Sequence, residues 1–318
     1  MREGHAAANQ GAIILGNSNN VLSRRSARIL LAALFLGAGC GGAARAQNLV
    51  GETFREIETR YIFGFTVGSD IGPEGEKEFV YGVVGRFGKR DGTYRAFDHT
   101  FEFEYVPTQF DLLEFEAPGT THYIRNVTDL EDRNTTQFKG LAFAWHRLLI
   151  ERGPASPIGV AALVELEWSR IDGTAGTRER AYALETKLLA DVALIPNRLF
   201  FAVNASYEPE VVKPKGEPTE HESELGFSAA ISYRPIPIVL VGAGVQYFRV
   251  YQGLGLNRFE GDALFVGPNL YVQLTKKTFL TAAFATQVAG RSVDEPGKRL
   301  NLHDFERHRA RLRIHVEF

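Results

Sequence analysis

The chain has 318 residues, a formal net charge of −2 from 36 basic and 38 acidic residues, and one cysteine. This near-neutral balance, without a basic run interleaved with aromatic residues, excludes the electrostatic footprint of a nucleic-acid-binding protein. A single cysteine excludes a disulfide framework and a cysteine-based metal site. Glycine (32 residues) and phenylalanine (23 residues) are abundant whereas methionine occurs once, which favours strands over helices.

The first 46 residues have the pattern of an export signal. Three arginines precede the apolar run 29–38, and small residues ending in an Ala-Arg-Ala triplet follow it. We therefore expect signal-peptidase cleavage between Ala46 and Gln47, which would remove the only cysteine. Residues 1–46 are interpreted as leader and signal peptide, with Val21 as an alternative translation start. The apolar run is too short to cross a bilayer as a helix.

Residues 47–75 precede the regular strand pattern. Within them, the segment from Tyr61 to Val67 has three interpretations: a plug inside a barrel, a periplasmic lead-in, or an additional strand. Bacterial single-chain barrels have an even number of strands, and an added strand would make the number odd here. We therefore expect a plug or a lead-in, followed by a barrel formed by residues 76–318.

Twelve segments with β-strand patterning follow in chain order. Their approximate ranges are 76–87, 94–105, 109–116, 138–150, 158–171, 181–194, 199–208, 222–233, 238–251, 263–274, 278–288 and 309–318. The connections between them alternate between tight, proline-marked or short turns and longer polar segments. The tight ones are 106–108, 154–157, 195–197, 235–237 and 275–277, and the long ones are 117–137, 172–180, 209–221, 252–262 and 289–308. Long loops on one side and short turns on the other are typical of bacterial barrels.

Alternation within the strands predicts an oily face and a charged face. In the last strand, 310–318, apolar side chains alternate with arginine, histidine and glutamate, and the chain ends on Phe318. A strand points successive side chains to opposite faces, so one face suits lipid and the other a wet lumen. We predict an all-β fold, a transmembrane antiparallel β-barrel of about twelve strands. The alternative for this ending is the edge strand of a soluble β-sandwich.

The lumen-facing charges are the best candidates for function. By parity, acidic residues point inward from several strands and basic residues oppose them, which would set up a transverse field able to orient polar solutes. The lumen-lining candidates are Glu102, Glu104, Glu165, Glu167, Glu185, Lys187, Asp191, Glu224, Arg309, Arg311 and Arg313. The same charges could instead pair and pack a narrow lumen shut. The charge pattern favours neither an open lumen nor a blocked one.

Catalysis has less support. The outer-membrane phospholipase carries a histidine and a serine two residues apart on a lipid-facing strand, and no His-x-Ser occurs here. His99 shares its face with aromatic residues and is interpreted as an interfacial histidine. We expect no catalytic residue, no metal and no cofactor. The leading hypothesis is a channel or transporter for small solutes, the second a structural or partner-binding surface barrel, and the third a lipid-modifying enzyme.

Several phrases resemble an uncharacterised proteobacterial family of outer-membrane barrels, loosely akin to transporter-like barrels of aromatic-degradation gene clusters. They are Phe63-Gly-Phe-Thr66, Gly68-Ser-Asp70, Gly85-Arg-Phe-Gly-Lys-Arg90 and Tyr207-Glu-Pro-Glu210. The resemblance implies the outer membrane of a Gram-negative cell, with membrane lipid, the barrel-assembly machinery and an unknown small solute as partners. The terminal Phe318 is expected to be the assembly signal, and the protein is expected to be a monomer.

Overall fold

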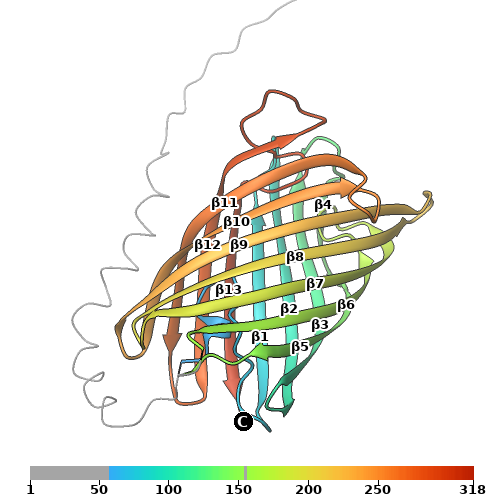
Figure 1. Cartoon of the computed structure of the whole chain (residues 1–318). Helices are drawn as coiled ribbons and strands as arrows, with labels where there is room; N and C mark the ends of the chain where they lie inside the picture. The colour runs from blue at the N-terminus through green and yellow to red at the C-terminus, as the bar shows by residue number, and fades with distance from the viewer. Residues whose placement is uncertain (1–56, 154–155) are drawn as a thin grey trace, which may run out of the picture. The chain divides into compact units, whose positions relative to one another are not determined.

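The computed structural model describes residues 57–153 and 156–318. The predicted leader and its cleavage positions, Ala46 and Gln47, lie outside the described residues. The described chain forms a closed antiparallel barrel whose strands incline to its axis, so that β7–β10 run obliquely across β1–β3 in Figure 1. In the described part of the chain, no helix has the length and apolar character needed to cross a bilayer.

Thirteen strands are defined in the described part of the chain. They are β1 (Lys77–Phe87), β2 (Thr93–Thr108), β3 (Asp111–Arg125), β4 (Arg133–Phe138), β5 (Gly140–Ile150), β6 (Ile158–Ile171), β7 (Arg178–Ile195), β8 (Leu199–Pro214), β9 (Glu220–Ile236), β10 (Val239–Gln252), β11 (Arg258–Gln273), β12 (Thr278–Ser292) and β13 (His308–Glu317). Consecutive strands pair with each other, except that β4 and β5 both pair with β3, and β13 closes the barrel on β1. The predicted all-β barrel fold is confirmed.

β4 and β5 are one wall strand interrupted at Lys139, so the barrel has twelve wall strands. β3 pairs with both pieces, opposing Gly119 to Phe138 and Glu116 to Ala142. One more residue lies between these pairs on the β4/β5 side than on the β3 side, which is a β-bulge. Pro118 sits opposite the interruption, where the ladder needs no N–H from it.

The bulge explains the largest error in the predicted strand limits. Pro118-Gly119 looks like the start of a loop, and the sequence predicted a connection over 117–137. In the structure β3 continues to Arg125 and β4 begins at Arg133. Similarly, the turn expected at 106–108 is wrong, because β2 continues through Pro107 and the turn is at residues 109–110. The ladder is irregular there too, which accommodates the proline.

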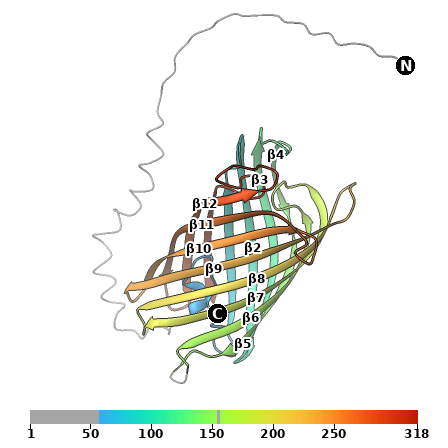
Figure 2. The same ribbon diagram turned by 45° about the horizontal axis from the view of Figure 1, so that its top comes forward.

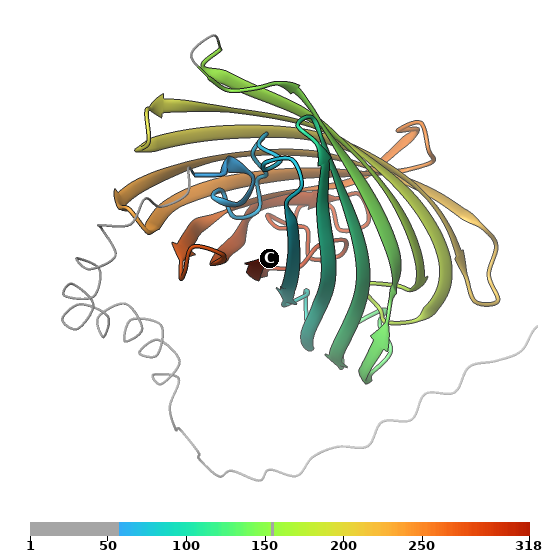
Figure 3. The same cartoon turned by 90° about the horizontal axis from the view of Figure 1, so that it is seen from below.

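Short and long connections lie at opposite ends of the barrel. The short end holds the turns after β2, β7, β9 and β11 and the C-terminal residue, and Figure 3 views the barrel from this end. The opposite end, which comes forward in Figure 2, holds the longest connection, residues 293–307 between β12 and β13. We call these the turn end and the loop end.

The strands present their apolar face outward. Along β13, Leu312, Ile314 and Val316 are exposed on the outer surface, whereas His315 between them is fully buried. The C-terminal Phe318 also lies outside, where its ring stacks on that of Phe79 with the centroids 5.1 Å apart. The outer surface therefore suits hydrocarbon, as the alternating pattern predicted.

Candidate functional site in the barrel lumen

Residues 57–76 lie inside the barrel at the turn end, where Figure 3 shows them within the opening. We call this segment the plug. It contains one short 3₁₀ helix, η1 (Thr59–Tyr61), and otherwise irregular backbone. Ile62 and Phe63 are fully buried against Phe200 and Leu240 on the inner wall. The segment Tyr61 to Val67 is therefore no barrel strand, whereas the division of the chain at residue 75 stays a prediction.

A row of carboxylates crosses the inner face of β1, β2 and β3. Glu78 lies directly opposite Glu104 in the ladder, and Glu104 lies opposite Glu114. All three side chains are buried. Like charges placed directly opposite each other on a sheet are destabilising, so this row needs a cation. We call it the carboxylate row.

Arg60 of the plug supplies that cation. Its Nη2 lies 2.6 Å from Glu104 Oε2 and 3.8 Å from Glu78 Oε2, and its Nη1 lies 3.9 Å from Glu114 Oε1. The guanidinium also stacks on the ring of Tyr61, 4.4 Å from the centroid. A buried charge persists only when paired, so Arg60 and the carboxylate row stabilise each other.

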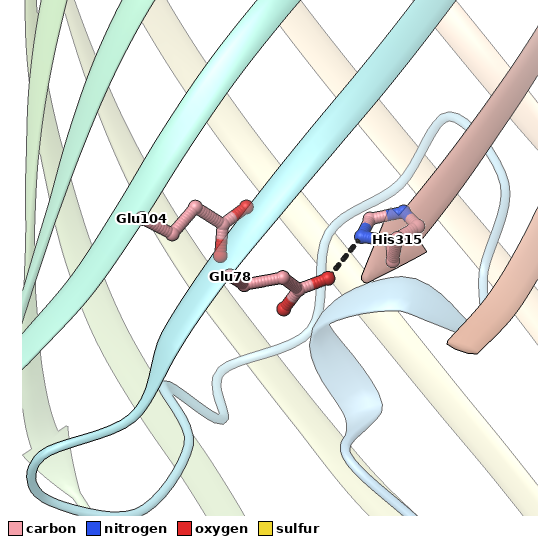
Figure 4. Close-up of side chains that lie close together, drawn as sticks. All are labelled: Glu78, Glu104 and His315. Carbon is pink, nitrogen blue, oxygen red and sulfur yellow. Dashed lines mark hydrogen bonds and ion pairs between the residues drawn. The ribbon is translucent and has the colours of Figure 1, made fainter. Parts of the chain in front are cut away.

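The ends of the carboxylate row are completed by a phenol and two histidines. The hydroxyl of Tyr61 shares its single proton between Glu78 Oε2 (2.8 Å) and Glu104 Oε2 (2.7 Å). His315 Nδ1 lies 2.7 Å from Glu78 Oε1, as the dashed line in Figure 4 shows. At the other end His146 Nε2 lies 3.0 Å from Glu114 Oε2.

A second anchor of the plug is Asp191 on β7. Its carboxylate accepts hydrogen bonds from the backbone N–H (2.5 Å) and hydroxyl (2.6 Å) of Ser69 and from the hydroxyl of Thr59 (2.9 Å). Arg152, in the connection after β5, pairs with Asp191 and with Asp70 of the plug (2.7 Å). Asp191 therefore binds both ends of the plug's loop.

Wall side chains also bind the plug backbone directly. Asn204 accepts from the N–H of Val67 (2.8 Å) and donates to the carbonyl of the same residue (2.7 Å). Ser232 donates to the carbonyl of Ile62 (2.7 Å), and Arg311 donates to that of Gly64 (3.2 Å). These contacts satisfy backbone groups that irregular structure would otherwise leave unpaired.

Only glycine fits at one turn of the plug. Gly64 has a φ of +70°, and a Cβ there would lie 2.7 Å from Asn269 Cβ and 2.9 Å from Ala283 Cβ. The Phe63-Gly-Phe pattern thus lets the chain reverse against β11 and β12. The ring of Phe65 then packs against the cluster that contains Phe265.

A cavity of about 120 Å³ remains beside the plug. Arg60, Glu102, Glu116, Lys187 and Arg313 line it among others, so its surface is charged. Its volume corresponds to a few water molecules. The plug therefore occupies the lumen at the turn end.

The loop end is narrowed as well. The carbonyl of Gly173, in the connection between β6 and β7, accepts hydrogen bonds from Arg86 on β1 (2.5 Å) and His122 on β3 (2.8 Å). Asn301 and Phe305 of the long 293–307 connection are buried, and Gln287 on β12 donates to the carbonyl of Asn301 (2.9 Å). These connections fold inward over the lumen.

The structure places every lumen-lining candidate on the inner face. Glu102 pairs with Arg313, and Glu104 with Arg60. Arg309 pairs with Glu306 of the long connection (2.6 Å). The remaining pairs are Glu167 with Lys139 (2.7 Å) and Glu185 with Lys187 (2.9 Å), while Glu165 faces the cavity. The three arginines of β13 therefore bind three different partners, Glu306, Gly64 of the plug and Glu102.

Glu224 extends an acidic patch on β6 to β9. It lies opposite Glu208 in the ladder, as Glu222 lies opposite Glu210 and Glu165 opposite Glu185. The sequence predicted Glu165, Glu185 and Glu224 but not Glu208, Glu210 or Glu222. Of these three, only Glu210 lies outside the predicted strands, because the strand 199–208 was predicted to end before it. The prediction also missed Arg60, Glu78, Glu114 and His146, although the alternation of 109–116 places Glu114 on the charged face.

Two triads of the carboxylate row have their donor atoms within 4.8 Å of one another, Glu78–Glu104–His315 and Glu102–Glu104–Glu114. Oxygen and imidazole donors at such spacing suit a cation in general. In this chain the position is taken by the guanidinium of Arg60, at 2.6 Å from Glu104. The site is therefore built around an organic cation that the chain itself supplies.

Residues 55–318 match DUF6662, a family of unknown function. The chain belongs to this family. The resemblance to an uncharacterised family of barrels is thereby confirmed, and the match spans the plug and all the strands. No curated protein matches the sequence.

Two solved structures share the fold of this DUF6662 chain. An outer-membrane channel from Pseudomonas putida F1 is 11% identical, with a TM-score of 0.50 over 79% of this chain and 98% of the channel. The β domain of the Bordetella autotransporter BrkA is also 11% identical, with a TM-score of 0.50 over 77% of this chain and 100% of that domain. The fold of the DUF6662 chain is that of outer-membrane β-barrels.

Proposed function

We propose that the chain is an outer-membrane channel for small cationic solutes, closed by its plug. The observation that carries the proposal is the position of Arg60 in the carboxylate row. A wall of facing glutamates costs stability, and a structural barrel would gain by replacing them with neutral residues. Retaining the glutamates and covering them with a cation carried by a separate segment fits a solute path that can be closed.

The plug is bound mainly by groups that water can replace. Its contacts to Asp191, Asn204 and Ser232 are hydrogen bonds, and its contacts to the carboxylate row are ion pairs. Such hydrogen bonds contribute only about 1 to 3 kcal/mol each once exchange with water is counted. The buried apolar side chains of the plug are those of Tyr61, Ile62, Phe63 and Ile71. Release of the plug toward the turn end would expose these four side chains, so their burial favours the closed form.

The solute class follows from the cation that the row binds in the closed form. A guanidinium or ammonium group fits between Glu78, Glu104 and Glu114, where Arg60 now lies, and would compete with it. The acidic patch on β6 to β9 continues the same sign of charge toward the loop end. Rows of carboxylates favour cations in the pores of channels.

The proposed channel has a defined orientation in the outer membrane. The short turns and the plug would face the periplasm, the loops the outside, and the apolar outer surface the membrane lipid. The exposed Phe318 would be the signal for the barrel-assembly machinery, and the barrel would act as a monomer.

A reversible disulfide tests whether the plug is the gate. The side chain of Ser69 lies against Gly159 on β6, where a Cβ would be 3.3 Å from Ser69 Cβ, close to the separation in disulfides. We expect a Ser69→Cys, Gly159→Cys variant to show no channel openings in planar bilayers when oxidised, and to open on addition of a reductant.

The single variants Ser69→Cys and Gly159→Cys are the matched controls and should not respond to the redox state. Equal conductance of the oxidised and reduced double variant would mean that the plug does not gate the lumen. Folded wild-type protein that never opens would remove the channel proposal altogether and leave a structural barrel.

A further inference from the structure

The outer surface of the barrel has a hollow where lipid-facing walls are usually convex. Its volume is about 1010 Å³, and it extends over β1, β2, β3, β5, β6, β7 and β13. The side chains that line it are almost all aromatic or aliphatic. They include Phe79, Phe101, Phe115, Leu141, Leu166 and Trp168. We call it the outer groove.

Residue size accounts for the shape of the outer groove. Ala117 faces outward on β3, lies opposite Phe101 on β2 and is two residues from Phe115. The alanine contributes one methyl group, while Phe101 and Phe115 are 61% and 50% exposed. The rings of Phe101 and Phe115 therefore form the sides of the groove, and Ala117 forms its bottom. The bulge at Lys139 adjoins it and bends the wall.

A row of hydrogen-bonding side chains borders the outer groove on its loop-end side. The hydroxyl of Tyr81 and His99 Nδ1 share a hydrogen bond of 2.9 Å, and His99 Nε2 and the hydroxyl of Thr121 share one of 3.2 Å. The hydroxyls of Thr121 and Thr136 are 3.0 Å apart. This polar row crosses β1, β2, β3 and β4 on the outer face.

Two arginines lie beyond the polar row, nearer the loop end of the outer wall. Arg95 and Arg125 are exposed and share the outward parity of His99 and Thr121 on β2 and β3. The guanidinium of Arg95 lies 6.0 Å from the ring centroid of Tyr123. From the turn end to the loop end, the outer wall therefore presents an apolar groove, neutral hydrogen-bonding groups and then positive charge.

We propose that the outer groove, the polar row and the two arginines bind one anionic acyl lipid. The acyl chain would lie in the groove, the ester or hydroxyl oxygens against His99 and Thr121, and the anionic headgroup at Arg95 and Arg125. Each part of such a lipid meets a surface of matching chemistry in the right order. The inference rests on the membrane location proposed above but not on channel activity.

The two tryptophans of the sequence make the proposal measurable. Trp168 lines the outer groove, whereas Trp145, also outward-facing, does not. A Trp145→Phe variant therefore reports on the groove, and a Trp168→Phe variant reports on ordinary lipid-facing surface. Each variant is reconstituted in phosphatidylcholine vesicles that contain a minor fraction of a chain-brominated lipid, which quenches tryptophan fluorescence on contact.

The quantity compared is the quenching by brominated phosphatidylglycerol divided by that by brominated phosphatidylcholine. This ratio cancels differences in depth between the two tryptophans. We expect a ratio several-fold above one at Trp168 and near one at Trp145. A ratio near one at both positions would overturn the proposal, because the groove would then hold whatever lipid surrounds it.

Variants in the Trp145→Phe background separate the parts of the site. Ala117→Phe should fill the groove, and Arg95→Gln with Arg125→Gln should remove the charge, and each should lower the Trp168 ratio to near one. Val203→Phe, at an outward position on β8, is the matched control and should leave the ratio high. An unchanged ratio in both test variants would also overturn the assignment.

Insertion of the barrel is checked on the same samples by its heat-dependent gel migration. A chain that fails to enter vesicles would contradict the membrane location in the proposed function. A barrel that inserts but shows no lipid preference would contradict only the outer-groove proposal.

Discussion

Arg60 connects the plug to the wall through charge. Its guanidinium faces four carboxylates, those of Glu58, Glu78, Glu104 and Glu114, at 2.6 to 3.9 Å. Removing one partner of a buried ion pair costs about 3–5 kcal/mol, because the remaining charge is left unpaired. The closed form therefore depends on this one side chain more than on any single hydrogen bond of the plug.

We predict that Arg60→Gln opens the channel. If the closed form loses about 3 kcal/mol of stability, the ratio of closed to open barrels falls by about 100-fold. Open probability in planar bilayers should rise accordingly. Arg90→Gln is the control, because Arg90 also pairs with two acidic residues but lies in the exposed loop after β1. Comparable opening in both variants would argue against a specific role for Arg60.

Lys89 provides a pH-dependent contact at the loop end. Its Nζ donates to the carbonyls of His303 (3.0 Å) and Asp304 (2.9 Å), tying the connection after β1 to the long connection. Burial lowers the pKa of Lys89 to about 8 from its ordinary 10.5. The unfolded chain then binds more protons than the folded chain between these two values, so the folded form gains stability as pH rises from about 8 to 10.5.

We predict that this gain disappears in Lys89→Met. The unfolding temperature of the wild type should rise relative to that of the variant across the window from about pH 8 to 10.5. Circular dichroism of detergent-solubilised barrels measures it. Lys298→Met, at an exposed position of the long connection, should follow the wild type. Parallel pH profiles for the wild type and Lys89→Met would contradict the assignment.

At the scale of elements, the twelve wall strands could be predicted because alternation is a local property of the sequence. Their limits could not, since a bulge at Lys139 and irregular pairing near Pro107 depend on what the partner strand offers. The plug was foreseen only as one alternative, because irregular backbone has no periodicity. Arg60 was missed for the same reason, and also because three of its four carboxylate partners lie on separate strands.

The plug's turn at Gly64 is sensitive to the addition of a single carbon atom. Gly64→Ala adds a Cβ that meets Asn269 and Ala283 and also imposes an unfavourable positive φ. We predict that the turn leaves the wall and that trypsin then cleaves after Arg60. Cleavage is measured by mass spectrometry of the released peptide.

Gly75→Ala separates the two causes. Gly75 also has a positive φ, +87°, but a Cβ there meets nothing within 4 Å. The Gly75→Ala substitution should therefore leave Arg60 protected from trypsin. Its backbone conformation should cost at most about 1–2 kcal/mol of stability. Equal cleavage in the two variants would assign the effect to φ rather than to contact with the wall.

At the scale of the whole molecule, charge is distributed unevenly around the lumen. β6 to β9 contribute facing glutamates, whereas the arginines Arg309, Arg311 and Arg313 come from β13 alone. Each arginine also has a separate contact: Arg313 with Glu102, Arg311 with the plug and Arg309 with Glu306. The same three residues thus contribute positive charge to the lumen and contact both the plug and the long connection.

We predict that replacing all three arginines with glutamine makes the barrel conduct more often and select more strongly for cations. Removal of three positive charges makes the net charge of the lumen more negative, which raises the local cation concentration. Loss of the Arg311 contact to Gly64 weakens the plug at the same time. The reversal potential in a KCl gradient reports selectivity, and open probability reports the plug.

A second variant removes negative charges from the lumen wall, away from the plug. Glu208→Gln with Glu224→Gln, a facing pair on β8 and β9, should shift the reversal potential toward anions with no change in open probability. This pair separates selectivity from gating, because neither glutamate contacts the plug in any hydrogen bond or ion pair described here. A reversal potential that moved in the same direction in both variants would show that the lumen charges do not determine which ions pass.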